Sequence, residues 1–303
     1  MASAADPGRA HARTPIRRVT PDRSSPDDGA VRPLQTRVGV PYKRLDSPHA
    51  GLTHLQLNHA QREVTVKIVY YGPGLSGKTT NLQMLHARTS PEVRGRLLTV
   101  ETHDDRTLFF DLLPVFFHTA SGFKVKVKLF TVPGQVIHNA TRRIVLQNAD
   151  AVAFIADSRR SMASENNAYW KNLLENMREN GLDAAQVPVV IQYNKRDLPE
   201  TKTDAEIEET RKKGKEKVIG AVAIRGEGVL ETLYAVLQEA YRSIDGRANL
   251  GRNISLTEEE FLSQIFSNVD TRGSALESKY PPKTPPASPN TPPPRSPRSG
   301  TSA

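Results

Sequence analysis

Residues 72–79 restrict the fold of this chain more than any other segment, because they read Gly-Pro-Gly-Leu-Ser-Gly-Lys-Thr. The pattern is G-x-x-x-x-G-K-[ST], which is typical of a phosphate-binding loop. Its glycines, Gly72, Gly74 and Gly77, leave room for a ring of backbone N–H donors around phosphate groups. A helix that starts directly after the loop adds the partial positive charge of its N-terminus.

The sequence on both sides of this loop has the context that the pattern needs. Residues 64–71 are β-branched and aromatic and predict a strand, and residues 79–87 carry leucines on one helical face. We therefore expect Lys78 to reach the β- and γ-phosphates of a nucleotide. We expect Thr79 to ligate Mg²⁺ through its hydroxyl, and Thr80 to contact the nucleotide beside it.

A second motif, Asn194-Lys195-Arg196-Asp197, follows an apolar run at 187–193. It fits N-K-x-D, a guanine-reading pattern in which Asn194, Lys195 and Asp197 contact the nucleotide. A carboxylate accepts hydrogen bonds from guanine N1–H and the 2-amino group, whereas adenine would leave that carboxylate unpaired. The two motifs in this order indicate a guanine-nucleotide-binding protein that rejects ATP.

The remaining periodicity predicts strands that alternate with helices. The predicted strands are 64–71, 108–117, 123–132, 149–156, 187–193 and 218–223, and the predicted helices are 79–87, 166–180 and about 230–241. The second and third strands form a hairpin, and the continuous apolar runs suit central strands of a sheet covered on both faces. We therefore expect an α/β fold whose mostly parallel sheet has an antiparallel edge strand. With the two motifs in this order, the chain resembles a Ras-like P-loop GTPase sandwich.

Proline is concentrated at the two ends of the chain. Both ends are also rich in Ser, Thr, Arg and Gly, so they bury too little surface to offset the entropy of ordering. The predicted organisation is a disordered basic Pro-rich N-terminal extension at 1–62, a Ras-like GTPase domain at 63–245, a linker with a short amphipathic helix at 246–270, and a disordered Pro-rich tail at 271–303.

The short helix begins at a predicted capping box, Thr257 to Glu260, behind a glycine-containing link from Gly246 to Gly251. Its apolar face either docks on the helix's own domain or receives a partner. In the tail, residues 283–289 fit the polyproline ligand pattern [KR]-x-x-P-x-x-P, although a solvated spacer has the same composition.

Composition excludes several classes of function. The chain has no cysteine, which rules out disulfides, thiolate metal sites, thiol catalysis and a cysteine-linked lipid. The net charge of +9 lies mostly in the two ends and no nucleic-acid-binding motif accompanies it, so we do not expect nucleic acid as a partner. No apolar run approaches the ~20 residues of a membrane span, and no signal-peptide core is visible. We expect a cytoplasmic protein without stable membrane insertion.

Four segments carry a resemblance to a known family: residues 67–83, 105–114, 131–135 and 192–199. They resemble the MglA family, the bacterial Ras-like GTPases of gliding motility and cell polarity, and a longer-tailed member of that family suits the overall layout. The resemblance covers about residues 63–245. It implies hydrolysis of GTP to GDP, Mg²⁺ as cofactor, concentration at a cell pole, and a roadblock-type GTPase-activating homodimer as partner.

The resemblance also assigns roles to individual residues of the nucleotide site. Thr107 resembles the switch I threonine that senses the γ-phosphate through Mg²⁺, so Thr79 and Thr107 are the expected metal ligands. Gly134 resembles the switch II glycine whose N–H meets the γ-phosphate. Ala223 resembles the loop residue whose N–H faces the oxygen of the base.

Two residues are the expected catalytic groups. Gln135 resembles the glutamine that orients the attacking water. Arg106 resembles an arginine finger supplied in cis, a group worth on the order of 10³–10⁵ in rate where it has been measured. A surface arginine without that role has the same sequence, so both interpretations of Arg106 stay open.

One position departs from the D-x-x-G pattern of Ras, because Thr131 stands where that pattern has aspartate. Threonine lacks the carboxylate that normally holds the waters of Mg²⁺, although members of the MglA family share this change. Two functions stay open. One is a GTP-hydrolysing switch for motility or polarity. The other is a non-cycling, nucleotide-bound scaffold protein that acts through its tails. In either case we expect the tails to bind a polar or cytoskeletal scaffold.

Overall fold

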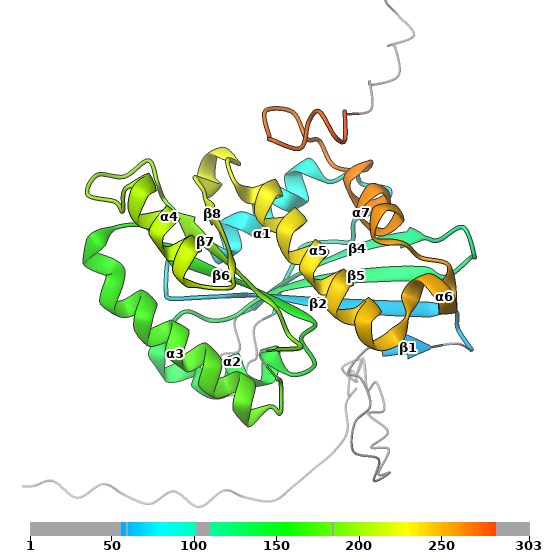
Figure 1. The fold of residues 1–303 in the computed structure, drawn as a ribbon, viewed down its shortest axis with the longest axis horizontal. Helices are drawn as coiled ribbons and strands as arrows, with labels where there is room; N and C mark the ends of the chain where they lie inside the picture. Colours follow the sequence, from blue (N-terminus) through cyan, green and yellow to red (C-terminus); the bar gives the residue numbers. More distant parts are fainter. Residues whose placement is uncertain (1–55, 59, 101–109, 184, 283–303) are drawn as a thin grey trace, which may run out of the picture. The chain divides into compact units, whose positions relative to one another are not determined.

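We describe the protein from a computed structural model, which places residues 56–58, 60–100, 110–183 and 185–282 (Figure 1). Its strands are β1 (Gln56–Asn58), β2 (Glu63–Tyr71), β3 (Leu98–Val100), β4 (Phe110–His118), β5 (Lys124–Thr131), β6 (Ala151–Asp157), β7 (Val189–Asn194) and β8 (Lys217–Gly220). Its α-helices are α1 (Lys78–Arg88), α2 (Asn139–Leu146), α3 (Ala163–Glu179), α4 (Asp204–Lys213), α5 (Val229–Ala248), α6 (Leu250–Ile254) and α7 (Glu258–Phe266). Short 3₁₀ turns are η1 (Val136–His138), η2 (Arg160–Met162) and η3 (Ala223–Arg225).

All of these strands belong to one sheet, whose order is β3-β4-β5-β2-β6-β7-β8. From β5 to β8 in that order, neighbouring strands run parallel. β4 pairs antiparallel with β5 as the predicted hairpin, β3 pairs antiparallel with β4 at the edge, and β1 pairs antiparallel with the start of β2. The predicted α/β fold, with a mostly parallel sheet and an antiparallel edge, is confirmed.

Helices cover both faces of the sheet, as Figure 1 shows. α1, α5 and α7 lie on one face, where Leu82 and Val236 belong to a large buried cluster. α2 and α3 lie on the other face, where Leu146 and Leu173 belong to a second cluster. Every residue of β6 is buried, as expected for a central strand between two helical layers. None of the helices in the described ranges is both long and apolar enough to cross a bilayer.

The parallel register brings three strand ends to one edge of the sheet. Tyr71 of β2 lies opposite Phe154 of β6, and Asp157 of β6 lies opposite Asn194 of β7. The loops that leave these strands therefore start beside one another, at the edge where open α/β sheets bind ligands. This register places the phosphate loop and the N-K-x-D motif next to each other.

The chain after residue 220 differs from the prediction in two places. β8 ends at Gly220, and Ala223 begins the turn η3 instead of ending a strand. Gly246 lies inside α5 and Gly251 lies inside α6, so the predicted glycine link is helical. A single glycine weakens a helix by only about 1 kcal/mol, and the extensive burial of α5 outweighs that preference.

α7 docks on its own domain, so residues 246–270 form part of the folded unit. The Phe261 ring of α7 packs against the rings of Phe117 of β4 and Tyr241 of α5, with centroid distances of 5.9 and 5.6 Å. The alternative in which this apolar face receives a partner is wrong, because the face is already covered. The buried side chains of α7 are Phe261, Leu262, Ile265 and Phe266.

Residues 267–282, which we call the C-terminal strap, follow α7 across the surface of the domain. Leu276 and Tyr280 are buried, and the hydroxyl of the buried Thr271 donates to the Tyr280 carbonyl at 2.5 Å. The disordered tail predicted at 271–303 is therefore wrong for residues 271–282, because their few apolar side chains find a surface to pack on. The disordered N-terminal extension predicted at 1–62 is wrong at 56–58, because these residues form β1 and pair with the start of β2. Residues 283–303 of the tail and 1–55 of the extension lie outside the described residues.

Replacing Phe261 tests whether α7 is an integral part of the domain. Phe261→Ala should lower the free energy of unfolding by about 3 kcal/mol, because it leaves a cavity between α7, α5 and β4. Urea denaturation measures the change. The exposed Glu259 on the same helix is the matched control, and Glu259→Ala should change stability by less than about 0.5 kcal/mol. Equal stabilities of Phe261→Ala and the parent would contradict the docking.

Candidate functional site

The phosphate loop, residues 72–77, leaves β2 and enters α1 in a shape that only glycine permits. Gly72 and Gly77 have φ angles of +137° and +101°, in the region that favours glycine. A Cβ at Gly72 would lie 2.2 Å from the carbonyl oxygen of Ile155, and a Cβ at Gly77 would lie 2.1 Å from Nδ2 of Asn194. The loop therefore packs against β6 on one side and against the N-K-x-D motif on the other.

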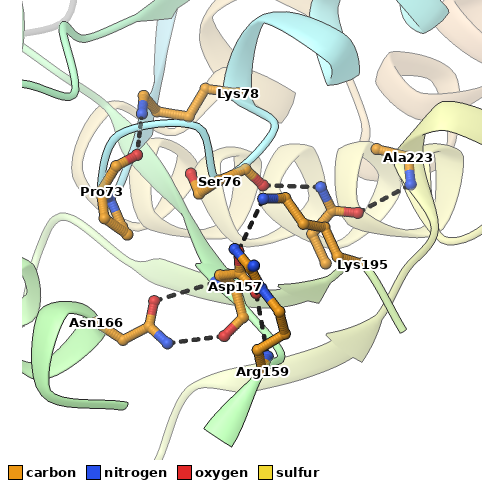
Figure 2. Close-up of polar contacts among 9 residues, drawn as sticks. Pro73, Ser76, Lys78, Asp157, Arg159, Asn166, Lys195 and Ala223 are labelled. Atoms are coloured by element: carbon orange, nitrogen blue, oxygen red, sulfur yellow. Dashed lines mark hydrogen bonds and ion pairs between the residues drawn. The ribbon is translucent and has the colours of Figure 1, made fainter. Parts of the chain in front are cut away.

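Lys78 is buried beneath this loop, with 6% of the residue exposed. Its Nζ donates to the carbonyl oxygens of Gly72 at 3.0 Å and Pro73 at 2.6 Å. Figure 2 shows the bond to Pro73. Burial, and after it the positive charge of Arg142, lowers the pKa of Lys78 to about 7. A phosphate in the loop would favour the charged form of the lysine, so the arrangement suits an anion.

Gly134 meets the phosphate loop backbone to backbone. A Cβ on Gly134 would lie 2.4 Å from the Cα of Gly74. A larger residue at position 134 would therefore push the segment after β5 away from the phosphate loop. The Gly134 carbonyl accepts a hydrogen bond from the Tyr169 hydroxyl at 2.6 Å, and the Gln135 carbonyl accepts one from Arg142 at 2.5 Å. Sequence reasoning did not identify Tyr169 and Arg142, which come from α3 and α2.

A buried carboxylate, Asp111 of β4, lies across from the start of α1. Its Oδ2 accepts hydrogen bonds from the hydroxyls of Thr79 at 2.7 Å and Thr131 at 3.0 Å, and its Oδ1 accepts one from Thr99 at 2.9 Å. The backbone N–H of Asp111 donates in turn to the Thr131 hydroxyl at 2.8 Å. The carboxylate that Thr131 lacks is therefore present at the site, supplied by the neighbouring strand.

A cavity of about 550 Å³ lies between the phosphate loop, β4 and the segment after β5. Its lining residues are Leu75, Gly77, Lys78, Thr79, Thr80, Thr99, Asp111, Thr131, Val132, Pro133, Gly134, Gln135 and His138. Gln135 is exposed at this cavity, and its Oε1 lies 3.2 Å from Nε2 of His138. From the predicted set, the cavity thus brings together residues 77–80, Gly134 and Gln135, whereas Gly72 and Gly74 are not among its lining residues.

The oxygen-rich lining fits Mg²⁺ bound together with a nucleotide. Hydroxyl and carboxylate oxygens are the ligands that Mg²⁺ prefers, and the ion usually completes its shell with phosphate oxygens and water. Within the described ranges, no group of three or more His, Cys, Asp or Glu side chains could hold a metal by itself. Thr79 and Asp111 are the residues that would hold the ion or its waters, and the nucleotide would supply further ligands.

Asn194 joins the phosphate loop to the loop after β8. Its Nδ2 donates to the Ser76 carbonyl at 2.8 Å, and its Oδ1 accepts from the Ala223 N–H at 2.9 Å. Figure 2 labels these two partners, Ser76 and Ala223. Ala223 was predicted to offer this N–H to the base, but in this structure the donor is bonded to Asn194. Ala223 therefore lies beside the N-K-x-D motif with its N–H engaged inside the protein.

Lys195 is held beside this region by the buried Asp157 at the end of β6. The Lys195 Nζ donates to Asp157 Oδ2 at 2.8 Å, and Arg159 donates to the same carboxylate (Figure 2). Burial alone would raise the pKa of Asp157, but the hydrogen bonds from Arg159 and Lys195 outweigh burial and lower it to about 2. Asp157 is therefore a charged partner that orients Lys195.

The other predicted site residues fall into two groups. Asp197 is exposed in the turn after β7, and Thr80 is half-buried at the cavity. Arg106 and Thr107 lie outside the described residues, so their roles stay predictions. Asp111 is the residue that sequence reasoning missed although a signal existed, because the predicted hairpin already paired its strand with the strand that ends at Thr131.

Comparison with known proteins places this site in a family context. Residues 52–240 match the model of the ADP-ribosylation factor family. The chain is also 47% identical over 183 residues to the mutual gliding-motility protein MglA of Myxococcus xanthus (strain DK1622), which covers 59% of this chain and 92% of that protein. The family match ends within α5, before α6, α7 and the C-terminal strap.

Moving the carboxylate between strands tests the role of Asp111. Asp111→Asn should weaken the Mg²⁺-dependent part of GDP affinity by about tenfold, a loss on the scale of one hydrogen bond to a charged group. The double variant Asp111→Thr/Thr131→Asp should recover most of it. GDP titrations with Mg²⁺ and with EDTA measure the effect. The exposed Asp183 is the control, as Asp183→Asn should behave like the parent. An Asp111→Asn protein with the parent's Mg²⁺ response would remove Asp111 from the metal site.

Nucleotide binding should take up a proton at pH 8. With a pKa of about 7, Lys78 is mostly neutral at this pH, and bound phosphate raises its pKa and so favours the ammonium form. Affinity should therefore fall as the pH rises above 7. Calorimetric titrations in two buffers of different ionisation enthalpy measure the uptake, and Lys78→Arg, which stays charged, should show none of it. No uptake by the parent at pH 8 would show that Lys78 is already charged.

Proposed function

The chain belongs to the ADP-ribosylation factor family and is of the MglA type, and from that membership we propose that it is a GTP-hydrolysing molecular switch. It binds GTP with Mg²⁺ and hydrolyses it to GDP. It alternates between two states that differ in the loops around Thr107 and Gly134. One observation carries the proposal: Gly134 and Gln135 border the same cavity as a phosphate loop whose buried Lys78 donates to the loop's own carbonyl oxygens at Gly72 and Pro73.

In the hydrolytic step the side chains act by position and charge. Lys78 and the loop N–H groups stabilise the phosphates, and Mg²⁺, when bound, adds positive charge at the oxygens of the transferring group. Gln135 orients the attacking water. Arg142 and Tyr169 hold the peptide groups on either side of Gln135. Arg106 stabilises the charge that develops on the γ-phosphoryl group.

The name of the Myxococcus relative supports a role in gliding motility. We extend this role to cell polarity and to a concentration of the protein at a cell pole. A roadblock-type homodimer stimulates hydrolysis, and the tails at 1–55 and 283–303 bind a polar or cytoskeletal scaffold. Deleting either tail should leave nucleotide turnover intact and change localisation.

A non-cycling scaffold is the second candidate, and Thr131 is the residue that favours it. The position of Asp111 weakens that candidate, because a buried carboxylate lies within 3.0 Å of the Thr131 hydroxyl. A switch and a scaffold differ in turnover, so hydrolysis separates them.

Turnover by the purified full chain tests the proposal. We expect slow hydrolysis of GTP with Mg²⁺, no hydrolysis of ATP, and stimulation by a roadblock-type activator from the same organism. Gln135→Leu and Arg106→Ala should bind GTP as the parent does and lose most of the activated rate, on the order of 10²-fold or more. Phosphate release and nucleotide titration measure the two quantities separately.

Arg160 provides a matched control, since it is an exposed arginine whose guanidinium pairs with Glu206 on α4. Arg160→Ala should keep the activated rate. Tight GTP binding without turnover in any condition would make the scaffold the better function. An Arg106→Ala protein with the parent's activated rate would show that Arg106 is only a surface arginine.

A further inference from the structure

The C-terminal strap, the orange segment that follows α7 in Figure 1, is attached to the end of α1. Thr89 and Val269 form an antiparallel bridge, flanked by the hydrogen bonds Ser90 N–H to Asn268 carbonyl and Asp270 N–H to Arg88 carbonyl, both 2.8 Å. Thr89 and Val269 are both buried. Main-chain hydrogen bonds, and not only side-chain packing, therefore hold the strap against the end of α1.

The strap is attached to α5 as well. The Ala275 N–H donates to Glu231 Oε1 in the first turn of α5 at 2.7 Å. Tyr280 stacks on Phe266 with a centroid distance of 5.3 Å and lies 6.2 Å from the ring of Tyr234. Lys279 Nζ donates to the Tyr234 hydroxyl at 2.8 Å. Aromatic rings from α5, α7 and the strap thus pack together and hold the C-terminal end of the strap in place.

The guanine loop, residues 222–228, lies between these two attachments. It connects the strand end at β8 to α5, and it carries the Ala223 N–H that Asn194 accepts. Arg88 lies between the strap and this loop. Its Nη1 donates to the Arg272 carbonyl at 3.2 Å, and its Nη2 lies 2.9 Å from the point where a Cβ would stand on Gly226. Glu231 holds the strap only three residues beyond the loop.

We propose that the C-terminal strap positions the guanine loop, through Arg88 and Glu231, and thereby slows the release of bound guanine nucleotide. The inference rests on the proposed function, because it assumes that the loop meets a guanine base. A loop with added restraints at Gly226 and just beyond Gly228 opens less often than one restrained by its own contacts alone. The strap lies beyond the family match, so this restraint is an addition to the shared domain.

The absence of cysteine in the chain allows a reversible test. Thr89 and Val269 form a non-hydrogen-bonded antiparallel pair, whose Cα atoms are typically about 4.5 Å apart and within disulfide range. In the full-length variant Thr89→Cys/Val269→Cys, the oxidised protein should release a fluorescent GDP analogue about threefold or more slowly than the reduced protein. Equal rates in the two redox states would count against the strap as a restraint.

Loosening the strap should have the opposite effect. Tyr280→Ala should speed GDP release by about tenfold, the scale of one lost hydrogen bond or aromatic contact. Tyr280→Phe should keep the parent's rate, because the aromatic contacts remain. Deleting 267–303 should match Tyr280→Ala, and deleting only 283–303 should match the parent. If the deletion at 267 prevents folding, Tyr280→Ala and the redox pair still decide the matter.

A control separates positioning from general loss of stability. Met177 is buried on the opposite face of the sheet, so Met177→Ala should lower stability and leave the GDP release rate unchanged. Release that follows stability in every variant would overturn the inference. Tight GDP binding with the same release rate in all strap variants would overturn this inference and leave the proposed function standing. Failure of the parent to bind guanine nucleotide would overturn the proposed function, and this inference with it.

Discussion

The side chain of Asn194 is the contact on which the rest of the site depends. One primary amide donates to the phosphate loop at Ser76 and accepts from the guanine loop at Ala223, and it is buried. Neither aspartate nor leucine can make both bonds, because the first has no donor when ionised and the second has no polar atom. The same amide occupies the space next to Gly77 that a side chain would need. The two loops are therefore positioned by a single group, and the geometry of one constrains the other.

A second layer of hydrogen bonds supports that contact from inside the fold. Asn81 of α1 and Gln192 of β7 form a reciprocal amide pair at 2.9 and 3.0 Å, and both are fully buried. Asn81 also donates to the Gly77 carbonyl, while Gln192 donates to Thr232, whose hydroxyl donates to the Gly228 carbonyl. These bonds run from the phosphate loop to the end of the guanine loop. A buried polar network is rigid only when its members are paired, since each unpaired group would cost about 1–3 kcal/mol.

The parts that sequence reasoning predicted are those whose cause is local. The phosphate loop requires glycine at Gly72 because of a positive φ, and β6 is apolar throughout because both of its faces are covered. The parts it missed depend on distant partners. β3 is three residues long and exists as a strand through its pairing with β4. The strap is ordered because the Tyr280 ring packs against the rings of Phe266 and Tyr234. α4 is an exception, because its capping box at Thr203 and Glu206 is a local signal and yet no helix is predicted there.

The two sets of restraints on the guanine loop differ in how they respond to a binding partner. The inner set, through Asn194 and Gln192, is buried, so it cannot change without opening the core. The outer set lies at the surface, where Arg272 is exposed and a cavity of about 810 Å³ borders Arg88, Val269 and Pro282. Although Val269 and Tyr280 of the strap are buried, a segment at the surface opens at lower free energy than the core. In the proposed switch, the permanent restraint on the guanine loop therefore lies in the core, and the adjustable restraint lies in the strap, outside the shared domain.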